Sequence, residues 1–291
     1  MYKVGLVGYG VVGKGIHRLF KESVWAIYDP YLFQGNRLNL SHISQTHNTN
    51  FSKGHFKDMD LIVVAVPTNE KEDWSADTSI LWEAVEWIRE ITNAVILIKS
   101  TTPPTEILKI YERYTHIVFS PEYMGESKYF TPEWKYPHPQ NMESHTWQTF
   151  GGDKEDTSFC VDVFKRHMGV DTQHWQTDIV TASLSKYIEN SFFAMKVTFC
   201  NEWYDIATEL GVDWNELREL WVLDPRINKN HTLVFPEDRG YGGKCFPKDT
   251  RAIIKEMRDL GYNAELMIAM DKVNQEMRKL NETRTTKTDS K

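Results

Sequence analysis

The sequence predicts an α/β protein in which a parallel sheet, covered by helices on both faces, precedes an all-helical domain with a long central helix. Short apolar runs alternate with segments of helical period up to about residue 176. Such runs, apolar on both faces of the strand, are typical of a parallel sheet between two helix layers. Beyond that point, the segments have helical spacing only.

The elements of the sheet domain follow one another in a regular rhythm. Strands are expected at 3–7, 24–29, 60–68, 93–101, 116–122, 146–152 and 170–175, the last at the sheet edge. Helices are expected at 11–22, 78–91, 103–114 and 153–168. The third begins with proline, which suits a first helical turn. Residues 125–145 contain several prolines and aromatic residues and are expected to form a long surface loop.

The second part of the chain reads as helices separated by glycines. Residues 178–210 contain neither proline nor glycine, which predicts one long helix ending at Gly211. Asp213 and Glu216 form a capping box for the next helix. A further helix is expected to start near Asp249, and a last one spans 263–280. We therefore expect a dinucleotide-binding domain at 1–176, a helical catalytic and dimerisation domain at 177–282 and a flexible tail at 283–291.

Composition limits the classes of function. The 291 residues carry a net charge of -7, with a pI near 5.8, which argues against a general nucleic-acid binder. Three cysteines, at 160, 200 and 245, are too few and too scattered for a disulfide framework or a zinc site. No bound metal is therefore expected, and a reduced, cytoplasmic setting fits these cysteines best. No signal peptide or membrane span is evident.

A glycine-rich turn follows the first strand. In "GLVGYGVVGKG", Gly8, Gly10 and Gly13 form the pattern GxGxxG, in which the three glycines allow a tight turn, close approach of a pyrophosphate and close packing of the helix on the strand. Asp29 ends the second strand, where a carboxylate accepts from an adenosine ribose hydroxyl. No arginine follows to bind a 2′-phosphate. The pattern predicts a Rossmann-type domain that binds NAD, and the alternative is a plain βα turn with Asp29 as a strand-end cap.

"RGYGGKCFPKDT", residues 239–250, places Cys245 in a glycine-rich turn instead of an apolar run. A thiol just before a helix N-terminus and near Lys248 favours the nucleophilic thiolate. An inert cysteine in an irregular loop explains the same residues, and chemistry alone leaves both interpretations open.

Three further sets of polar residues gain meaning only in combination. Lys186 and Asn190 are four residues apart on the long helix and could stabilise an oxyanion or form a solvated polar stripe. Glu122 and Glu126 follow a parallel strand, where α/β folds place ligand sites. Thr101 could cap the helix that begins at Pro103.

Together these segments resemble the UDP-glucose/GDP-mannose 6-dehydrogenases. The shared stretches, in family order, are "VGLVGYGVVG", "VAVPT", "IKSTTPP", "SPEYMGES", "LSKYIENSFFAMKVTFCNE" and "GYGGKCFPKDT". The last two are the most specific, and the resemblance runs from residue 1 to about 280. It implies oxidation of a sugar C6 alcohol to a carboxylate with two NAD in turn.

The resemblance also implies roles for individual residues. Cys245 would form a thiohemiacetal and then a thioester, and Lys186 and Asn190 would stabilise the oxyanion. Asp249 would assist base chemistry through a water that Thr101 helps to position, and Glu122 would activate the water for hydrolysis. The implied NAD-binding residues are Gly8, Gly10, Val11, Val12, Gly13, Asp29, Pro67, Thr68, Thr101 and Lys248. The implied substrate-binding residues are Glu122, Glu126, Lys186, Asn190, Arg226, Tyr241 and Gly242.

The chain departs from the family in one respect. Family members usually have a further domain after the helical one, which binds the nucleotide part of the sugar nucleotide, and that domain is not expected here. The nucleotide could be held less tightly, a separate chain could complete the site, or the substrate could differ. A homodimer through the helical domain is expected, because a long apolar-striped helix must bury its face. The alternatives to an active enzyme are an inactive NAD-binding homologue that serves as an assembly partner, and a two-electron hydroxyacid dehydrogenase, which has no need of the cysteine.

Overall fold

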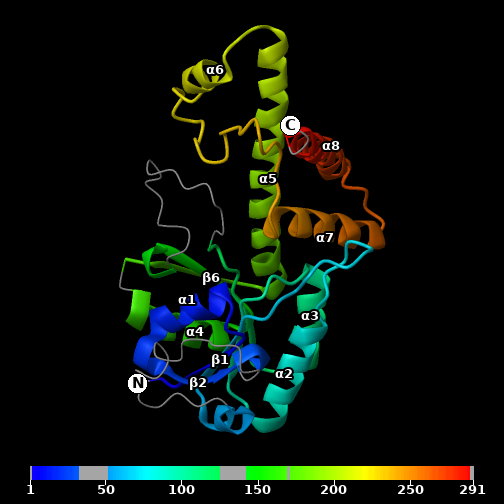
Figure 1. Cartoon of the computed structure of the whole chain (residues 1–291). Coiled ribbons are helices and arrows are strands. Elements are labelled where there is room, and N and C mark those ends of the chain that lie inside the picture. Colours follow the sequence, from blue (N-terminus) through cyan, green and yellow to red (C-terminus); the bar gives the residue numbers. More distant parts are fainter. Residues whose placement is uncertain (1, 33–51, 125–141, 169–170, 289–291) are drawn as a thin grey trace. The chain divides into compact units, whose positions relative to one another are not determined.

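The computed structural model describes residues 2–32, 52–124, 142–168 and 171–288 (Figure 1). The chain forms two compact units, each described here by itself. The first unit contains residues 1–69 and 76–186, and the second contains residues 70–75 and 187–291. Their junction falls inside the long helix, between Lys186 and Tyr187. No helix in the described ranges is long and apolar enough to cross a membrane.

The first unit is built on a seven-stranded sheet of order β2-β1-β3-β4-β5-β6-β7. Its strands are β1 (Val4–Val7), β2 (Val24–Tyr28), β3 (Leu61–Val64), β4 (Val95–Ile98), β5 (Ile117–Phe119), β6 (Trp147–Gly151) and β7 (Gln173–Thr177). β1 to β5 are parallel, whereas β6 pairs antiparallel with β5 and parallel with β7. The expectation of a uniformly parallel sheet was therefore wrong at this edge. An apolar run sets a strand's burial but not its direction.

Helices cover both faces of this sheet, as the alternation of strands and helices predicts. They are α1 (Val11–Phe20), α2 (Ser79–Ile91), α3 (Pro104–Arg113) and α4 (Lys154–Met168). One buried cluster joins α1 and α4 to strand residues such as Leu6 and Val63. The other joins α2 and α3 to residues of opposite parity, such as Ile62 and Ile98. Along β3, β4 and β5, successive side chains therefore enter two different cores, which is why these strands are apolar throughout.

Short 3-10 helices complete the described part of this unit. They are η1 (Lys21–Ser23), η2 (Pro30–Leu32), η4 (Lys53–Asp58) and η5 (Met142–Ser144). Most of the loop expected at 125–145 lies outside the described residues.

The second unit is helical. It contains most of α5 (Ile179–Glu209), with α6 (Trp214–Trp221), α7 (Cys245–Asp259) and α8 (Glu265–Thr288). Gly211 has φ +68, and the Asp213 side chain accepts from the Glu216 amide at 2.9 Å, so both predicted boundaries are confirmed. α8 ends at Thr288, within the segment 283–291 that was expected to be a tail.

α7 begins four residues earlier than predicted, at Cys245 and not at Asp249. Pro247 lies in the first turn of the helix. Backbone N–H groups in that turn have no intrahelical acceptor, so proline loses no hydrogen bond there.

Residues 70–75, from the connection between β3 and α2, belong to the second unit and pack on α7. The Trp74 ring faces the guanidinium groups of Arg258 and Arg251, at 5.3 and 5.7 Å from its centroid. Arg251 also lies 3.5 Å from Glu70. Trp74 has φ +73, a strained conformation for a residue with a side chain.

Candidate active site

The predicted NAD turn has the geometry that each glycine was expected to supply. Gly8 has φ +91. A Cβ on Gly8 would lie 2.3 Å from the carbonyl oxygen of Ala65, the residue that follows β3. A Cβ on Gly13 would lie 2.2 Å from the Gly8 carbonyl oxygen, so α1 sits directly against the turn. At Gly10 nothing lies within 4 Å of that position. Together with the start of α1 at Val11, this open side matches the place of a pyrophosphate.

Asp29 lies beside this turn. Its Oδ2 accepts from the Tyr9 amide at 2.7 Å, and its Oδ1 accepts from the Tyr31 amide at 2.8 Å. These bonds fix the carboxylate at the end of β2. Because each carboxylate oxygen has two lone pairs, Asp29 can still accept from a ribose hydroxyl.

Tyr9, the residue between the first two glycines, is tied to α1. Its hydroxyl lies 2.6 Å from His17 Nδ1. Burial raises the pKa of Tyr9 and lowers the pKa of His17, so both groups are neutral at pH 7. No sequence pattern singles out this pair, which stiffens the turn from inside.

The ends of β3 and β4 are locked together on the same edge of the sheet. Ser100 Oγ donates to the Val66 carbonyl at 2.7 Å and accepts from the Val66 amide at 2.8 Å. Thr68 donates to the Thr101 carbonyl at 2.7 Å. The N-cap of α3 is Pro103, with no side-chain cap, so the alternative role of Thr101 as a cap was wrong. Pro67 is exposed next to these residues.

Glu122 follows β5 at this edge and is buried, with 7% of its surface exposed. Its Oε1 accepts from the amides of Tyr123 at 2.9 Å and Met124 at 3.1 Å. Its Oε2 lies 3.4 Å from the ammonium of Lys99, which is 1% exposed. Lys99 was not among the predicted site residues. Its place at the end of the apolar run "NAVILIK" is the signal that could have found it, because a buried lysine is rare unless it is paired.

Lys186, near the start of α5, belongs to this first unit. Its Nζ lies 5.1 Å from the centroid of the Tyr123 ring, next to Glu122 in sequence. The Tyr123 hydroxyl in turn lies 3.3 Å from Ser185. Glu126 lies outside the described residues.

In the second unit, Cys245 is the first residue of α7, and its side chain is exposed. The other two cysteines are buried. Burial raises the pKa of Cys200 to about 11 and raises the pKa of Cys160 further, so both stay protonated. Of the three thiols, Cys245 alone is accessible, and the positive end of the α7 dipole favours its thiolate.

Asp249 lies one turn further along α7 and is 1% exposed. Its Oδ2 accepts from Asn190 Nδ2 of α5 at 2.6 Å, and its Oδ1 accepts from Lys248 at 2.5 Å. The Tyr187 hydroxyl is buried nearby, and burial, followed by the charges of Asp249 and Glu256, raises its pKa well above 10. The structure therefore brings together three predicted residues, Asn190, Lys248 and Asp249.

The glycine turn before Cys245 is fixed by α8. Tyr241 is buried, and its hydroxyl donates to Asp271 at 3.1 Å. Its backbone amide donates to Asn274 Oδ1, and its carbonyl accepts from Asn274 Nδ2. Its side chain thus has an internal role. Gly240 has φ +75, and a Cβ there would lie 2.5 Å from Asn274 Oδ1. A Cβ on Gly242 would crowd Arg278 at 3.2 Å.

Arg226 is not brought to Asn190 or Asp249 by any contact in the described structure. Its side chain is 86% exposed and is paired with Asp224.

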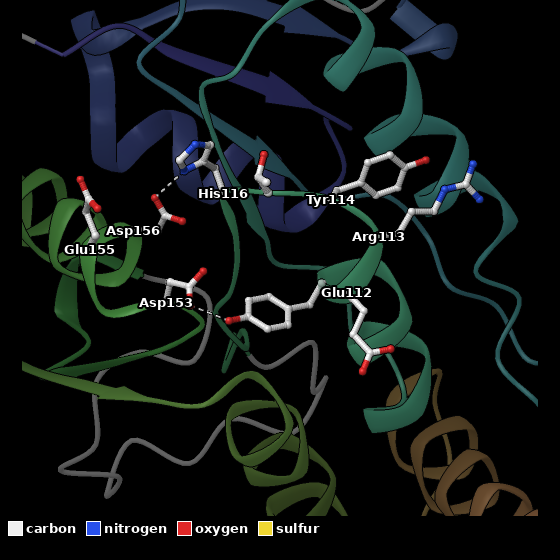
Figure 2. Close-up of a pocket in the computed structure, with 9 residues that line it drawn as sticks. Glu112, Arg113, Tyr114, His116, Asp153, Glu155 and Asp156 are labelled. Atoms are coloured by element: carbon white, nitrogen blue, oxygen red, sulfur yellow. Dashed lines mark hydrogen bonds and ion pairs between the residues drawn. The ribbon is translucent and has the colours of Figure 1, made fainter.

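A cavity of about 430 Å³ lies elsewhere in the first unit (Figure 2). Figure 2 shows His116 beside Asp156. His116 Nδ1 lies 2.9 Å from Asp156 Oδ1, and the Tyr111 hydroxyl donates to Asp153 at 2.7 Å. His116 precedes β5, so the cavity is at the amino-terminal edge of that strand. The residues after β1, β3, β4 and β5 that were predicted as functional lie at the carboxyl ends, where α/β folds bind ligands. The cavity does not coincide with the predicted site.

This glycine turn, strand-end acid and doubly wound sheet define a dinucleotide-binding dehydrogenase fold. Residues 4–131 match the NAD binding domain of the UDP-glucose/GDP-mannose dehydrogenase family, and residues 180–276 match its central domain. The chain belongs to this family, and NAD is its cofactor.

Individual relatives agree with this assignment. The chain is 27% identical to a UDP-glucose 6-dehydrogenase of Rickettsia prowazekii over 234 residues, 78% of this chain and 51% of the relative. A UDP-glucose dehydrogenase structure from Pyrobaculum islandicum is 25% identical with a TM-score of 0.76, covering 94% of this chain and 68% of that one. The chain thus spans about half the length of the curated relative.

A 3-hydroxyisobutyrate dehydrogenase structure from Mycobacterium tuberculosis also shares the fold. Its TM-score is 0.71 at 13% identity, and the match covers 95% of this chain and 93% of that one. At this identity the likeness concerns the fold alone.

Proposed function

We propose that this protein oxidises the C6 alcohol of a nucleotide sugar to a carboxylate, with UDP-glucose as the first substrate to test. Bound NAD accepts a hydride in each of two successive oxidations. The observation that carries the proposal is the exposed Cys245 thiol at the start of α7, in the unit that also holds the buried Asn190–Asp249–Lys248 set.

The proposed chemistry uses Cys245 as a covalent holder between the two oxidations. Its thiolate adds to the C6 aldehyde, and loss of a second hydride from the thiohemiacetal gives a thioester. Lys186 and Asn190 stabilise the oxyanion, and Asp249 takes up protons through a water that Thr101 positions. Glu122 then activates water to release the acid, with Glu126 beside it in sequence.

The open side of Gly10 and the strand-end residues Pro67, Thr68 and Thr101 support the NAD end of the proposal, with Val11, Val12 and Lys248 as further contacts. At the substrate end we propose Glu122, Lys186, Asn190, Arg226 and the backbone of Tyr241 and Gly242. A separate nucleotide-binding chain remains a possible partner for the far end of the substrate.

We further propose a homodimer through α5. Its exposed apolar side chains recur at helical spacing and are Leu184, Ile188, Phe192, Phe199, Trp203 and Ile206. A stripe of this kind needs a partner surface.

The decisive test is NADH formation from a panel of sugar nucleotides. We expect two NADH per sugar with the right substrate, and loss of that turnover in Cys245→Ala. Cys200→Ala, which removes a buried thiol of the same unit, is the control and should keep turnover. If the protein binds NAD yet yields no NADH with any sugar nucleotide, the proposal is wrong. The inactive-homologue alternative then stands.

A hydroxyacid dehydrogenase is the second candidate, favoured only by the shared fold. It would release one NADH per substrate and would not depend on Cys245. The same assay, run with small hydroxyacids, separates the two reactions.

A further inference from the structure

Lys99 is the most deeply buried charged side chain at the carboxyl edge of the described sheet. Its Nζ lies 3.0 Å from Ser120 Oγ, 3.0 Å from Gln148 Oε1 and 3.4 Å from the Pro121 carbonyl. Glu122 Oε2 is the fourth oxygen, also at 3.4 Å. Burial lowers the pKa of Lys99, and the Glu122 charge opposes that shift. Four oxygen acceptors around one nitrogen match the ammonium form.

This arrangement clamps the Glu122 carboxylate from two sides. Two backbone amides hold Oε1, and the ammonium of Lys99 faces Oε2. A buried carboxylate needs donors and a facing positive charge in place of the water it has lost. Lys99 supplies that charge, and the two amides fix the orientation of the carboxylate.

His145 forms another wall of the same cluster. It is 2% exposed, and its Nδ1 lies 4.0 Å from Glu122 Oε1, too far for a hydrogen bond. Neither ring nitrogen has a hydrogen-bond partner within the described ranges, and the same is true of Gln148 Nε2. Burial lowers the pKa of His145, so the imidazole is neutral. Buried polar atoms grouped in this way are typical sites of internal water.

We propose that Lys99 and His145 are positioning residues for the hydrolytic step: Lys99 holds the Glu122 carboxylate in its orientation, and His145 holds the water that Glu122 activates. This inference rests on the proposed function. In the step, the water oxygen bonds to the thioester carbon while one water proton passes to Glu122. The C–S bond breaks with its electron pair on Sγ of Cys245. The product acid releases its own proton to solvent, and the Glu122 proton returns to the thiolate.

The groups that can titrate around Glu122 come from several elements. Lys99 directly follows β4, His145 follows η5, Lys186 lies on α5 and Cys160 lies on α4. Cys160 stays protonated, because burial raises the pKa of its thiol. Lys99 is therefore the cation in contact with Glu122, and its removal should have the largest effect on hydrolysis.

The kinetic test separates hydride transfer from hydrolysis in Lys99→Met. We expect a normal burst of NADH, then a steady state about tenfold slower or more, with thioester on Cys245 visible by intact-protein mass. Lys109→Met, which removes an exposed lysine of the same unit, is the matched control and should behave as wild type.

Two further variants distinguish positioning from general damage. Glu122→Gln should stall at the thioester, and adding Lys99→Met to it should slow hydrolysis no further, because both act through one carboxylate. His145→Leu should also slow hydrolysis, whereas His145→Gln, which keeps a polar end, should recover much of the rate. Independent losses in the double variant, or equal rates in the two His145 variants, would contradict the inference.

A measurement without turnover keeps the outcomes apart. The carboxyl carbon signal of Glu122, identified by its loss in Glu122→Gln, should change its chemical shift in Lys99→Met relative to wild type. An unchanged signal overturns the role of Lys99 even if the enzyme is active. If wild type forms no NADH, the proposed function and the catalytic role fall together, whatever the signal shows.

Discussion

Asp249 illustrates how single residues of this protein combine burial with charge. Both carboxylate oxygens accept short bonds, one from the Asn190 amide and one from Lys248. A buried carboxylate depends on such donors, because it has lost its water. The donors that hold Asp249 are thus part of the folding energy as well as of the proposed chemistry.

Asn190→Ala should therefore destabilise the protein as well as slow turnover. Losing one donor to a buried carboxylate should lower the free energy of unfolding by about 1–3 kcal/mol. Urea unfolding measures this change. Asn215→Ala, at an exposed position of α6 in the same unit, should change stability by much less. Equal stabilities of the two variants would show that the 2.6 Å bond contributes nothing.

Two glycines of the NAD turn should respond in opposite ways to the same substitution. Gly13→Ala places a Cβ 2.2 Å from the Gly8 carbonyl oxygen, a clash that should cost about 1–3 kcal/mol of stability. Gly10→Ala meets no protein atom within 4 Å, so it should leave stability unchanged and weaken NAD binding. Thermal unfolding and calorimetric titration with NAD separate the two effects. A stable Gly13→Ala protein would contradict the packing argument.

Among the elements, α7 carries Cys245 and is packed on an aromatic cluster beside it. The His231 ring stacks on Phe193 with centroids 4.2 Å apart, and Phe246 lies 5.7 Å from it. Burial, with a smaller contribution from Lys196, lowers the pKa of His231 to about 4. The cluster therefore accepts the neutral imidazole and resists the charged one.

This lowered pKa makes stability depend on acidity. Since the folded pKa lies below the unfolded value, the contribution is present above about pH 6.5 and is lost as pH falls toward 4. The full loss is on the order of 3 kcal/mol. His231→Phe keeps the stacking and should flatten the unfolding free energy over this range. His55→Gln, at an exposed position of the first unit, is the control and should keep the wild-type dependence of the unfolding free energy on pH. If His231→Phe also kept that dependence, His231 would be excluded as its source.

Most elements could be predicted from the sequence because their patterns are local. Strands such as Leu61–Val64 are apolar on both faces, and α5 has no helix breaker. The start of α7 at Cys245 was missed, although Pro247 in its first turn is compatible with a helix. The antiparallel direction of β6 depends on pairing across the sheet, which no local pattern encodes.

The candidate site was predictable in part for the same reason. Gly8, Gly13 and Asp29 have roles fixed by backbone geometry close to them in sequence. Lys99 and His145 depend on contacts between segments far apart in the chain, and in the sequence a lysine after a strand looks like any solvated residue. Their burial appears only once β4, β5 and β6 are side by side.

At the scale of the whole molecule, the exposed stripe of α5 predicts assembly. Ile188 is 70% exposed, so replacing it by aspartate should disturb a partner surface and not the fold. We expect Ile188→Asp to reduce the solution mass from two chains to one, as measured by light scattering. Leu223 is 75% exposed and does not belong to the stripe, so the Leu223→Asp variant should remain dimeric. A monomeric wild type would contradict the proposed homodimer.

The packing of Trp74 on α7 limits how this gene could be cut or recombined. Because residues 70–75 belong to the second unit, that unit is assembled from two separate stretches of chain. A fragment starting at Tyr187 would leave Arg251 and Arg258 without their aromatic partner. Exchange of the helical part between related genes would therefore have to bring a compatible β3–α2 connection with it, so the two units are expected to evolve as a pair.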